Sequence, residues 1–398
     1  MKNKHNLCLL ALVVSFLLGW LVLADTPWGI INFAFGVCFS IIVYLAALTY
    51  VDGPLGPLVV RQNLERVGLV NKKGEAPFLL HKRKDPDNQN GLILTFENRE
   101  IAYEKWQEKQ AEIEAALNIF ITKIKSGRNR RLVEVYAVLA GMGLPDKIIW
   151  SPEYLSPTEF ILILGQGLSG LVTVDLTKIP HILLGGSTGS GKTILLKLLL
   201  RQCVEKDASL YLIDLKGGMD YYGWECVCHT AYTMAKARDI LKELVKELET
   251  RKEVLRRAGC SNLQIYNERV RPLYKRIVIG CDEIAELLDK TGRIKADKEI
   301  IDEITGYLAT IARQGRAMGI HIIAATQRPD SNTLPGQIKC NIDCRICGRA
   351  DNVLSQIILD NTDAADAIPK DAQGRFIMSD GTVFQGFWSD DLDEWFLL

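Results

Sequence analysis

The stretch Gly186-Ser187-Thr188-Gly189-Ser190-Gly191-Lys192-Thr193 follows the pattern G-x-x-x-x-G-K-[ST], which is the phosphate-binding loop. The apolar run Ile182-Leu183-Leu184 before it predicts a strand, and the leucine-rich residues 194–200 after it predict a helix. Glycines let successive backbone N–H groups point at phosphate oxygens, and the start of the helix adds the positive end of its dipole. Lys192 is then placed to reach the β- and γ-phosphates of a nucleotide, and the Thr193 hydroxyl to hold Mg²⁺. An ordinary glycine-rich turn between a strand and a helix is the alternative.

Residues 151–398 carry strand and helix patterns in alternation, which predicts a mostly parallel sheet between helices. The predicted strands are 160–164, 182–185, 209–214, 276–281, 320–325 and 343–348. Several of them are almost continuously apolar, as is typical of strands that are buried on both faces. We therefore expect an α/β fold with the glycine-rich loop at one end of the sheet.

A second strand end carries two carboxylates, Asp282 and Glu283, directly after the apolar residues 277–281. Hydrolysis of a bound nucleotide needs such groups, because one carboxylate can hold Mg²⁺ and the other can polarise the attacking water. We assign Asp282 to Mg²⁺ and Glu283 to the water. The alternative is an N-cap pair for the helix that residues 284–288 predict.

Gln327 ends a third apolar strand, before Pro329, and is a candidate for sensing the γ-phosphate or orienting water. A polar turn that terminates the strand is the alternative, but strand ends in such sheets converge on the ligand crevice.

An arginine that a neighbouring subunit supplies to the transition state is not identified by spacing alone. The candidates flank predicted strands and are Arg313, Arg316, Arg345 and Arg349.

Length, charge and cysteine content set broad limits. The 398 residues suffice for two or three domains, and with 48 Lys+Arg against 48 Asp+Glu the net charge of zero indicates no partner. The 10 cysteines are scattered without the framework of a small secreted protein, which favours a reducing compartment. Cys340, Cys344 and Cys347 form a cluster without a fourth ligand nearby, so we interpret them as small core residues rather than a metal site.

The N-terminal 50 residues predict a transmembrane hairpin. Residues 7–24 and 29–50 contain no charged residue, and each is long enough, at ~1.5 Å per residue, to cross a hydrocarbon core of about 30 Å. The positive-inside rule places both ends and the remaining chain in the cytoplasm, because basic residues flank the pair of spans: Lys2, Lys4, Arg61, Arg66, Lys72 and Lys73. A cleaved signal peptide is the alternative for the first span, but no small-residue cleavage site precedes the second.

Residues 51–90 predict a juxtamembrane linker, since Asp52 to Pro57 breaks regular structure and His81 to Asp87 is a charged turn. Residues 91–150 predict a small α/β accessory module. Its elements are a strand at 92–96, an amphipathic helix with apolar residues from Trp106 to Ile124, and a strand at 132–138. The sequence does not say whether this module binds a partner or seals subunits together.

A basic stretch lies at residues 251–276, with eight Lys or Arg against Glu253 and Glu268. Such a local excess of positive charge is a candidate footprint for nucleic-acid phosphates. A solvated helix face is the alternative.

Several motifs occur together in the order found in the FtsK/SpoIIIE DNA translocases. They are Leu164 to Gly170, Asp175-Leu176, Pro180 to Thr193, Leu212 to Gly218, Asn262 to Asn267, Asp282-Glu283, Arg316 to His321, Ala325 to Pro329 and Ile358 to Asp360. Residues 160–380 resemble this family, and the combination is far more specific than a phosphate loop alone. The resemblance implies a RecA-like motor core, usually assembled as a hexameric ring around DNA, with ATP bound between subunits and an arginine supplied in trans. It also implies pore loops, for which the candidates are the loop after Gly217-Gly218 and residues 290–298.

Two predicted spans, a short linker and a motor make a compact layout, similar to the coupling proteins of Gram-positive conjugative plasmids and integrative elements. We therefore expect a membrane-anchored ATP hydrolase that translocates DNA, with a relaxase and transfer-channel proteins as partners. The alternatives are a protein-secretion motor, a chromosome-partitioning translocase and a nucleotide-gated membrane scaffold. Secretion motors tend to carry several ATPase modules in one chain, whereas this sequence has one phosphate loop.

Overall fold

The computed structural model describes residues 37–42, 55–86, 88, 90–127, 129, 131–270, 273–327, 334–390, 392 and 395. These residues fall into two compact units, the first within Met1–Gly143 and the second within Leu144–Leu398. The expected spans at 7–24 and 29–50 lie outside the described residues, apart from a short helical segment at 37–42. Over the part of the chain that is described, no helix is long and apolar enough to cross a membrane.

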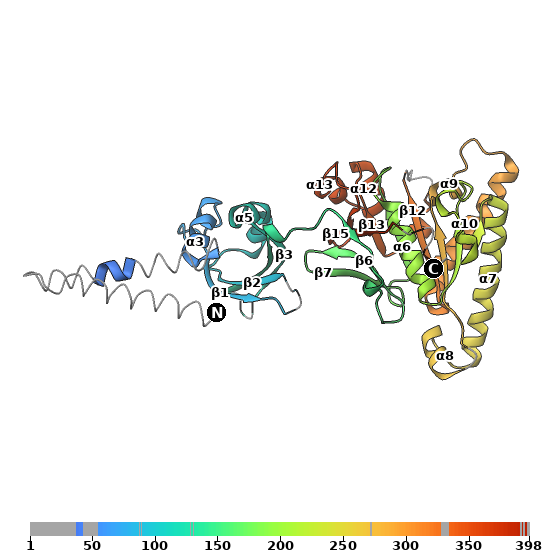
Figure 1. Ribbon diagram of the computed structural model, residues 1–398, viewed down its shortest axis with the longest axis horizontal. Coiled ribbons are helices and arrows are strands. Elements are labelled where there is room, and N and C mark those ends of the chain that lie inside the picture. Colours follow the sequence, from blue (N-terminus) through green and yellow to red (C-terminus); the bar gives the residue numbers. More distant parts are fainter. Residues whose placement is uncertain are drawn as a thin grey trace, which may run out of the picture. The chain divides into compact units, whose positions relative to one another are not determined.

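The first unit contains a four-stranded antiparallel sheet with the strand order β1-β2-β4-β3 (Figure 1). The strands are β1 (Phe78–Lys84), β2 (Gly91–Glu97), β3 (Ile119–Ser126) and β4 (Leu132–Leu139), and the helices are α3 (Pro57–Arg66), α4 (Tyr103–Glu108) and α5 (Gln110–Leu117). One core joins sheet and helices, and Phe96 and Trp106 contact each other within it at 5.2 Å between ring centroids.

The structure corrects two expectations for this unit. Part of the predicted linker at 51–90 belongs to the core, because α3 and β1 lie within it and bury Val60, Leu64 and Leu79. The apolar residues of α3 are few and lie among polar ones, which hides their helical spacing. The predicted helix is also shorter than expected, since Asn118 takes a left-handed conformation (φ 53°) and the chain continues as β3.

The second unit is built on a mixed sheet with the strand order β10-β9-β11-β12-β8-β13-β14-β15-β6-β7. Its parallel part consists of β8 (His181–Gly185), β9 (Ser209–Ile213), β10 (His229–Ala231), β11 (Ile277–Cys281), β12 (Ile320–Thr326) and β13 (Cys344–Cys347). Beyond β13 the strands pair antiparallel: β14 (Arg375–Met378), β15 (Val383–Trp388), β6 (Ile161–Gly167) and β7 (Gly170–Asp175). The short β5 (Ile148–Ile149) pairs parallel with β15. The five predicted strands from 182–185 to 343–348 are therefore present in the parallel part. The sixth, predicted at 160–164, is β6, and it pairs antiparallel with β15 and β7, within an extension that the alternation of strands and helices did not predict.

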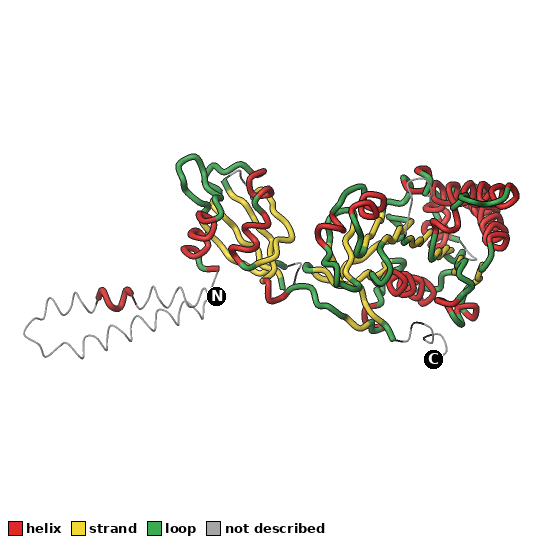
Figure 2. Tube along the Cα trace, turned by 90° about the horizontal axis from the view of Figure 1, so that it is seen from above, coloured by secondary structure: helices red, strands yellow, loops and turns green. Residues whose placement is uncertain are grey.

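Helices cover both faces of this sheet (Figures 1 and 2). Helix α6 (Lys192–Glu205) packs on one face, while α7 (Met234–Arg257), α10 (Lys295–Met318) and α12 (Asn352–Leu359) pack on the other. Strand β8 shows how alternation divides the core, since Ile182 and Leu184 point to the α6 side and Leu183 to the opposite side. The remaining short helices of this unit are α8 (Leu263–Arg269), α9 (Ile284–Leu288), α11 (Gly336–Lys339) and α13 (Asp363–Ala367).

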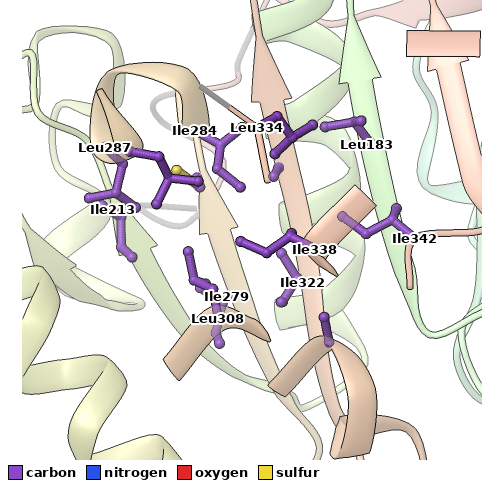
Figure 3. Close-up of a cluster of buried hydrophobic side chains, with 14 of the residues drawn as sticks. Leu183, Ile213, Ile279, Ile284, Leu287, Leu308, Ile322, Leu334, Ile338 and Ile342 are labelled. Carbon is purple, nitrogen blue, oxygen red and sulfur yellow. The ribbon is translucent and has the colours of Figure 1, made fainter. Parts of the chain in front are cut away.

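Figure 3 shows the core on the face that α7, α10 and α12 cover. There Ile213, Ile279 and Ile322 project from neighbouring strands toward helix residues such as Leu308 and Ile338. All five side chains are at most 2% exposed. Cys347 belongs to the same buried cluster and Cys344 to the core on the α6 side, as expected of small core residues. That interpretation is wrong for Cys340, which is exposed at the end of α11. This packing fixes the strands in register, and thereby the positions of the side chains that follow their carboxyl ends.

Candidate nucleotide site

The glycine-rich loop connects β8 to the first turn of α6, as the motif predicts. Gly189 (φ 76°) and Gly191 (φ 92°) take left-handed conformations that allow the chain to curl. A side chain on Gly191 would also lie 3.0 Å from the backbone nitrogen of Gly374, which donates a hydrogen bond to the Ser190 carbonyl (3.0 Å). The loop thus needs glycine both for its curvature and for close approach to the turn before β14.

The residues at this loop fit a polyphosphate. They line a pocket of about 530 Å³, within the range of small-ligand sites. Among the described residues, the buried Ser190 Oγ finds no hydrogen-bond partner. Lys192 is only 4% exposed; burial lowers its pKa, and the charges of Glu283 and Asp282 act in the opposite direction. A bound anion would compensate the buried ammonium and supply acceptors to the loop.

Asp282 follows β11 and is buried at 1% exposure. Its Oδ2 accepts a hydrogen bond from Lys216 Nζ (2.7 Å) and its Oδ1 accepts one from the Tyr221 hydroxyl (3.2 Å). Burial lowers the pKa of Lys216, but the hydrogen bond and charge of Asp282 outweigh it and raise that pKa above its ordinary value. Lys216 therefore places a protein cation directly beside the buried carboxylate.

Lys216 is held by the loop that follows β9. Asp214, buried at 1% exposure, accepts the backbone N–H groups of Lys216 (3.0 Å) and Gly218 (2.8 Å). The same loop carries Met219 and Tyr222, which are 83% and 82% exposed. Sequence reasoning named this loop as a candidate pore loop but missed Lys216 and Tyr221 as partners of Asp282. The sequence feature that could have indicated these contacts is the motif Leu212 to Gly218, because its glycines permit the tight turn that brings the loop back toward Asp282.

Glu283 and Gln327 lie together at the ends of adjacent strands. Thr326 Oγ1 donates to Glu283 Oε1 (2.6 Å), and the backbone N–H of Gln327 donates to Glu283 Oε2 (2.9 Å). The Gln327 side chain in turn accepts a hydrogen bond from Thr188 Oγ1 (3.1 Å) of the phosphate loop. Because β12 lies between β11 and β8, this chain of contacts links the acidic pair to the loop. Thr193 lines the same pocket in the first turn of α6.

The four candidate arginines lie in two different places. Arg349, after β13, donates to the Thr188 carbonyl (2.7 Å), to Ser187 Oγ (3.2 Å) and to the Lys370 carbonyl (2.8 Å). Arg345 pairs with Asp360 and the Ile342 carbonyl. These two arginines are therefore engaged by contacts within this chain, and Arg349 stiffens the phosphate loop itself.

Arg313 and Arg316 lie at the opposite edge of the sheet, near the C-terminal end of α10. Together with Arg276 and Lys178 they line a second pocket, of about 630 Å³, beside the amino ends of β8 and β11. Both are exposed; Arg316 Nε donates to the Thr177 carbonyl (3.2 Å). The phosphate loop lies at the carboxyl edge, so the two sites are separated by the length of the strands.

The basic stretch at 251–276 does not form one open surface. Arg251 and Arg276 are buried at 4% and 6% exposure and pair with Glu247 and Glu159. The other ion pairs of this stretch involve Lys252, Arg256, Arg257 and Lys275. Carboxylates therefore neutralise most of the positive charge in the expected nucleic-acid footprint. Most of these carboxylates lie outside residues 251–276, so a count of charges within that stretch does not include them.

A glycine-rich loop between a strand and a helix, a buried lysine, and a carboxylate pair on a nearby strand end define a P-loop nucleoside triphosphatase. Residues 155–331 match the FtsK/SpoIIIE family. The DNA translocase FtsK of Leptospira interrogans is 33% identical over 243 residues, covering 56% of this chain and 24% of the relative. The DNA translocase FtsK of Pseudomonas aeruginosa is 28% identical over 283 residues, covering 62% and 34%. The chain thus spans about a quarter to a third of the length of these relatives.

Solved structures show the same fold. The pCW3 conjugation coupling protein TcpA, in a monomer form with ATPγS, is 35% identical with a TM-score of 0.62, covering 83% of this chain and 94% of that chain. ATPases 2 and 3 of EssC from Geobacillus thermodenitrificans share the fold at a TM-score of 0.50 and 16% identity, covering 61% and 47%. This chain belongs to the FtsK/SpoIIIE family.

Proposed function

We propose that this protein is a membrane-anchored, ATP-driven DNA translocase that feeds DNA to a conjugative transfer channel. The observation that carries the proposal is its 35% identity to a conjugation coupling protein over 94% of that chain, combined with the nucleotide-site geometry of its own residues. A relaxase and channel proteins are the corresponding partners.

The site residues divide the work of ATP hydrolysis. The loop N–H groups and Lys192 bind the phosphates, while Thr193 and Asp282 would hold Mg²⁺, which would supply charge neutralisation at the phosphates. Glu283 is the residue that polarises the attacking water. Gln327 contacts both Thr188 of the loop and, through its backbone, Glu283, so it is positioned to report the state of the γ-phosphate to the acidic pair.

The arrangement supports catalysis between subunits. Strand β8 has five residues, roughly 17 Å at ~3.3 Å per residue, so arginines at its amino end are far from the phosphate loop of their own chain. Arg313 and Arg316 are therefore the candidates to complete a neighbour's site, and Arg345 and Arg349 are set aside because they are occupied in cis. In a closed ring, usually a hexamer in this family, every nucleotide site receives an arginine from the neighbouring subunit.

The test is ATP hydrolysis by the full chain with and without DNA. We expect stimulation by DNA and its loss, together with loss of DNA transfer, in Lys192→Ala and Glu283→Gln. The matched controls are Lys242→Ala, an exposed lysine of α7, and Glu286→Gln, an exposed residue of α9, and both retain activity. Hydrolysis that DNA does not change, in a protein with no measurable DNA affinity, would refute the proposal and favour a secretion motor or a scaffold.

The trans arginine and the anchor have their own tests. Arg316→Ala chains mixed with Lys192→Ala chains are expected to regain partial hydrolysis, because each variant supplies the half-site that the other lacks.

The hairpin at 7–24 and 29–50 predicts that the protein sediments with membranes and is released when residues 1–50 are removed. Recovery of the intact chain in the soluble fraction would contradict the anchor.

A further inference from the structure

The four-stranded sheet of the first unit has two faces of different character. One face packs on α3, α4 and α5 through a core that includes Leu94, Phe96 and Val135. The opposite face, which we call the open face, carries the residues that alternate with these along the strands. It consists of three cross-strand rows: His81, Thr95, Glu134 and Lys125; Arg83, Ile93, Tyr136 and Lys123; and Val138 with Phe120.

An irregularity in the edge strand β3 brings its lysines to the open face. The register of β3 shifts between Ile121 and Lys123, as in a β-bulge. A shift of one residue reverses which side chains point to the core. Lys123 and Lys125 therefore both lie on the open face, while Ile124 between them packs against the core. A similar shift in β1, the other edge strand, precedes the residues that place Arg83 on the same face.

The positive charge of the open face is only partly compensated. Glu134 is the one carboxylate of the three rows, and it pairs with Arg83 at 3.4 Å. Lys123 and Lys125 are exposed, and neither forms an ion pair with another residue that the structure describes. This differs from the stretch at 251–276, where carboxylates neutralise most of the charge. The lysines of β3 therefore remain available to phosphate groups.

Two aromatic rings share this face with the lysines. Phe120 of β3 is 39% exposed, although it is a large apolar side chain. Tyr136 lies on the neighbouring strand β4, and its ring is held by Lys125 Nζ, 4.7 Å from the ring centroid, and by its hydroxyl, which donates to Glu134 Oε2 (3.5 Å). Charges on edge strands also keep sheets from pairing with one another, but that role does not require exposed aromatic rings.

We propose that the open face of the first unit binds single-stranded DNA. Phe120 and Tyr136 stack on bases, and Lys123 and Lys125 contact the phosphates that flank them. A single strand is the partner that fits, because its bases can be splayed out onto flat rings, whereas those of a duplex are stacked on one another. The surface lies in a different unit from the nucleotide site, and only the choice of DNA over RNA rests on the proposed function.

The first test measures stacking. Binding of a fluorescent dT15 oligonucleotide to the full chain, without nucleotide, is followed by anisotropy. We expect Phe120→Ala and Tyr136→Ala each to weaken binding about tenfold, because each removes a ring on which a base stacks. Phe120→Tyr and Tyr136→Phe keep the rings and are expected to bind within about threefold of the unmodified chain, which separates stacking from a loss of folding.

The second test measures the phosphate contacts. The double variant Lys123→Gln, Lys125→Gln is expected to lower the salt dependence of dT15 binding by about 1.4 in the slope of log affinity against log salt, since each phosphate contact to a single strand contributes about 0.7. The matched control is Lys72→Gln, Lys73→Gln. Both lysines are exposed in the turn between α3 and β1, which α4 contacts where Lys105 Nζ donates to the Val70 carbonyl (2.7 Å).

Three results would overturn the inference. The first is unchanged dT15 affinity in both alanine variants. The second is an equal fall of the salt slope in the Lys72, Lys73 control. The third is a Tyr136→Trp chain whose added fluorescence is quenched by vesicles of brominated phosphatidylserine and not by dT15, which would make the open face a membrane surface.

Hydrolysis of ATP with duplex DNA is measured in the same variants and is expected to stay as in the unmodified chain. Loss of dT15 binding by the alanine variants with intact stimulation by duplex DNA supports the open face as a second DNA surface. Absence of stimulation in the unmodified chain would refute the proposed function, whereas the dT15 results decide this inference separately.

Discussion

Lys216 occupies the carboxylate to which we assign Mg²⁺, so replacing Lys216 by methionine tests that assignment directly. The substitution removes the ammonium 2.7 Å from Asp282 Oδ2 and leaves Asp282, at 1% exposure, with the Tyr221 hydroxyl as its remaining side-chain partner among the described residues. Breaking a fully buried ion pair costs about 3–5 kcal/mol. The Lys216 side chain is 32% exposed, so we discount the cost to about 1–2 kcal/mol.

If Asp282 is a Mg²⁺ ligand, the metal and Lys216 compete for the same oxygens. Lys216→Met is then destabilised in ADP with EDTA, and it recovers most of this loss when Mg²⁺ is added with ADP. The assay is thermal unfolding of the full chain under both conditions, where about 1–2 kcal/mol corresponds to roughly 3–6 °C. Buried Trp224 lies in the same loop as Lys216, so its fluorescence provides a signal for movement of that loop.

The control is Lys178→Met, whose ammonium lies 3.1 Å from Asp175 with 77% of the lysine side chain exposed. This surface pair is expected to contribute less than about 1 kcal/mol, with no dependence on Mg²⁺. An equal stabilisation by Mg²⁺ in the wild type and in Lys216→Met would refute the reasoning, because it would mean that the metal does not use the carboxylate that Lys216 neutralises.

Three further outcomes are expected. Gly185→Ala places its Cβ 2.4 Å from Ile358 Cγ1 in the core and should lower the free energy of unfolding in urea by about 1–3 kcal/mol. The double variant Gly185→Ala, Ile358→Ala should lose less stability than the sum of the two single variants, because the smaller side chain makes room for the new methyl group. Burial lowers the pKa of His181 to about 4 and that of His321 to about 3, so the unfolded chain binds more protons below pH 6.5. Stability should therefore be complete above pH 6.5 and fall toward pH 4 by up to ~1.4 kcal/mol per pH unit for each histidine, with a shallower fall in His181→Gln. Arg349→Ala removes donors to the phosphate loop and should weaken tripolyphosphate binding about tenfold, which calorimetry measures; unchanged binding would show that the loop keeps its shape without Arg349.

Local chemistry explains why parts of the site could be predicted. The phosphate loop depends on residues that are contiguous in the chain, because glycine conformations and a helix start are set by neighbours in sequence. Asp282, Glu283 and Gln327 were found because each ends an apolar strand, and ends of parallel strands meet at one edge. The core strands were recognisable for the same reason, since burial on both faces leaves a continuous apolar run.

Other features arise between distant segments, and no local pattern reports them. The Lys216–Asp282 pair joins residues 66 positions apart, and the Arg349 contact with Thr188 joins residues 161 apart. Arginines that look equivalent in sequence were separated only by the fold, which uses Arg345 and Arg349 in cis and leaves Arg313 and Arg316 at the opposite edge.

What the sequence by itself determined is the chemistry of the phosphate loop and acidic pair, together with the parallel strands that carry them. The tertiary structure alone decided which cation neutralises Asp282, which arginines remain available, and that Lys123 and Tyr136 share one face of the first sheet. The physical reason is that conformational preference and hydrophobic periodicity act over a few residues, whereas ion pairs and pocket walls depend on strand order and register.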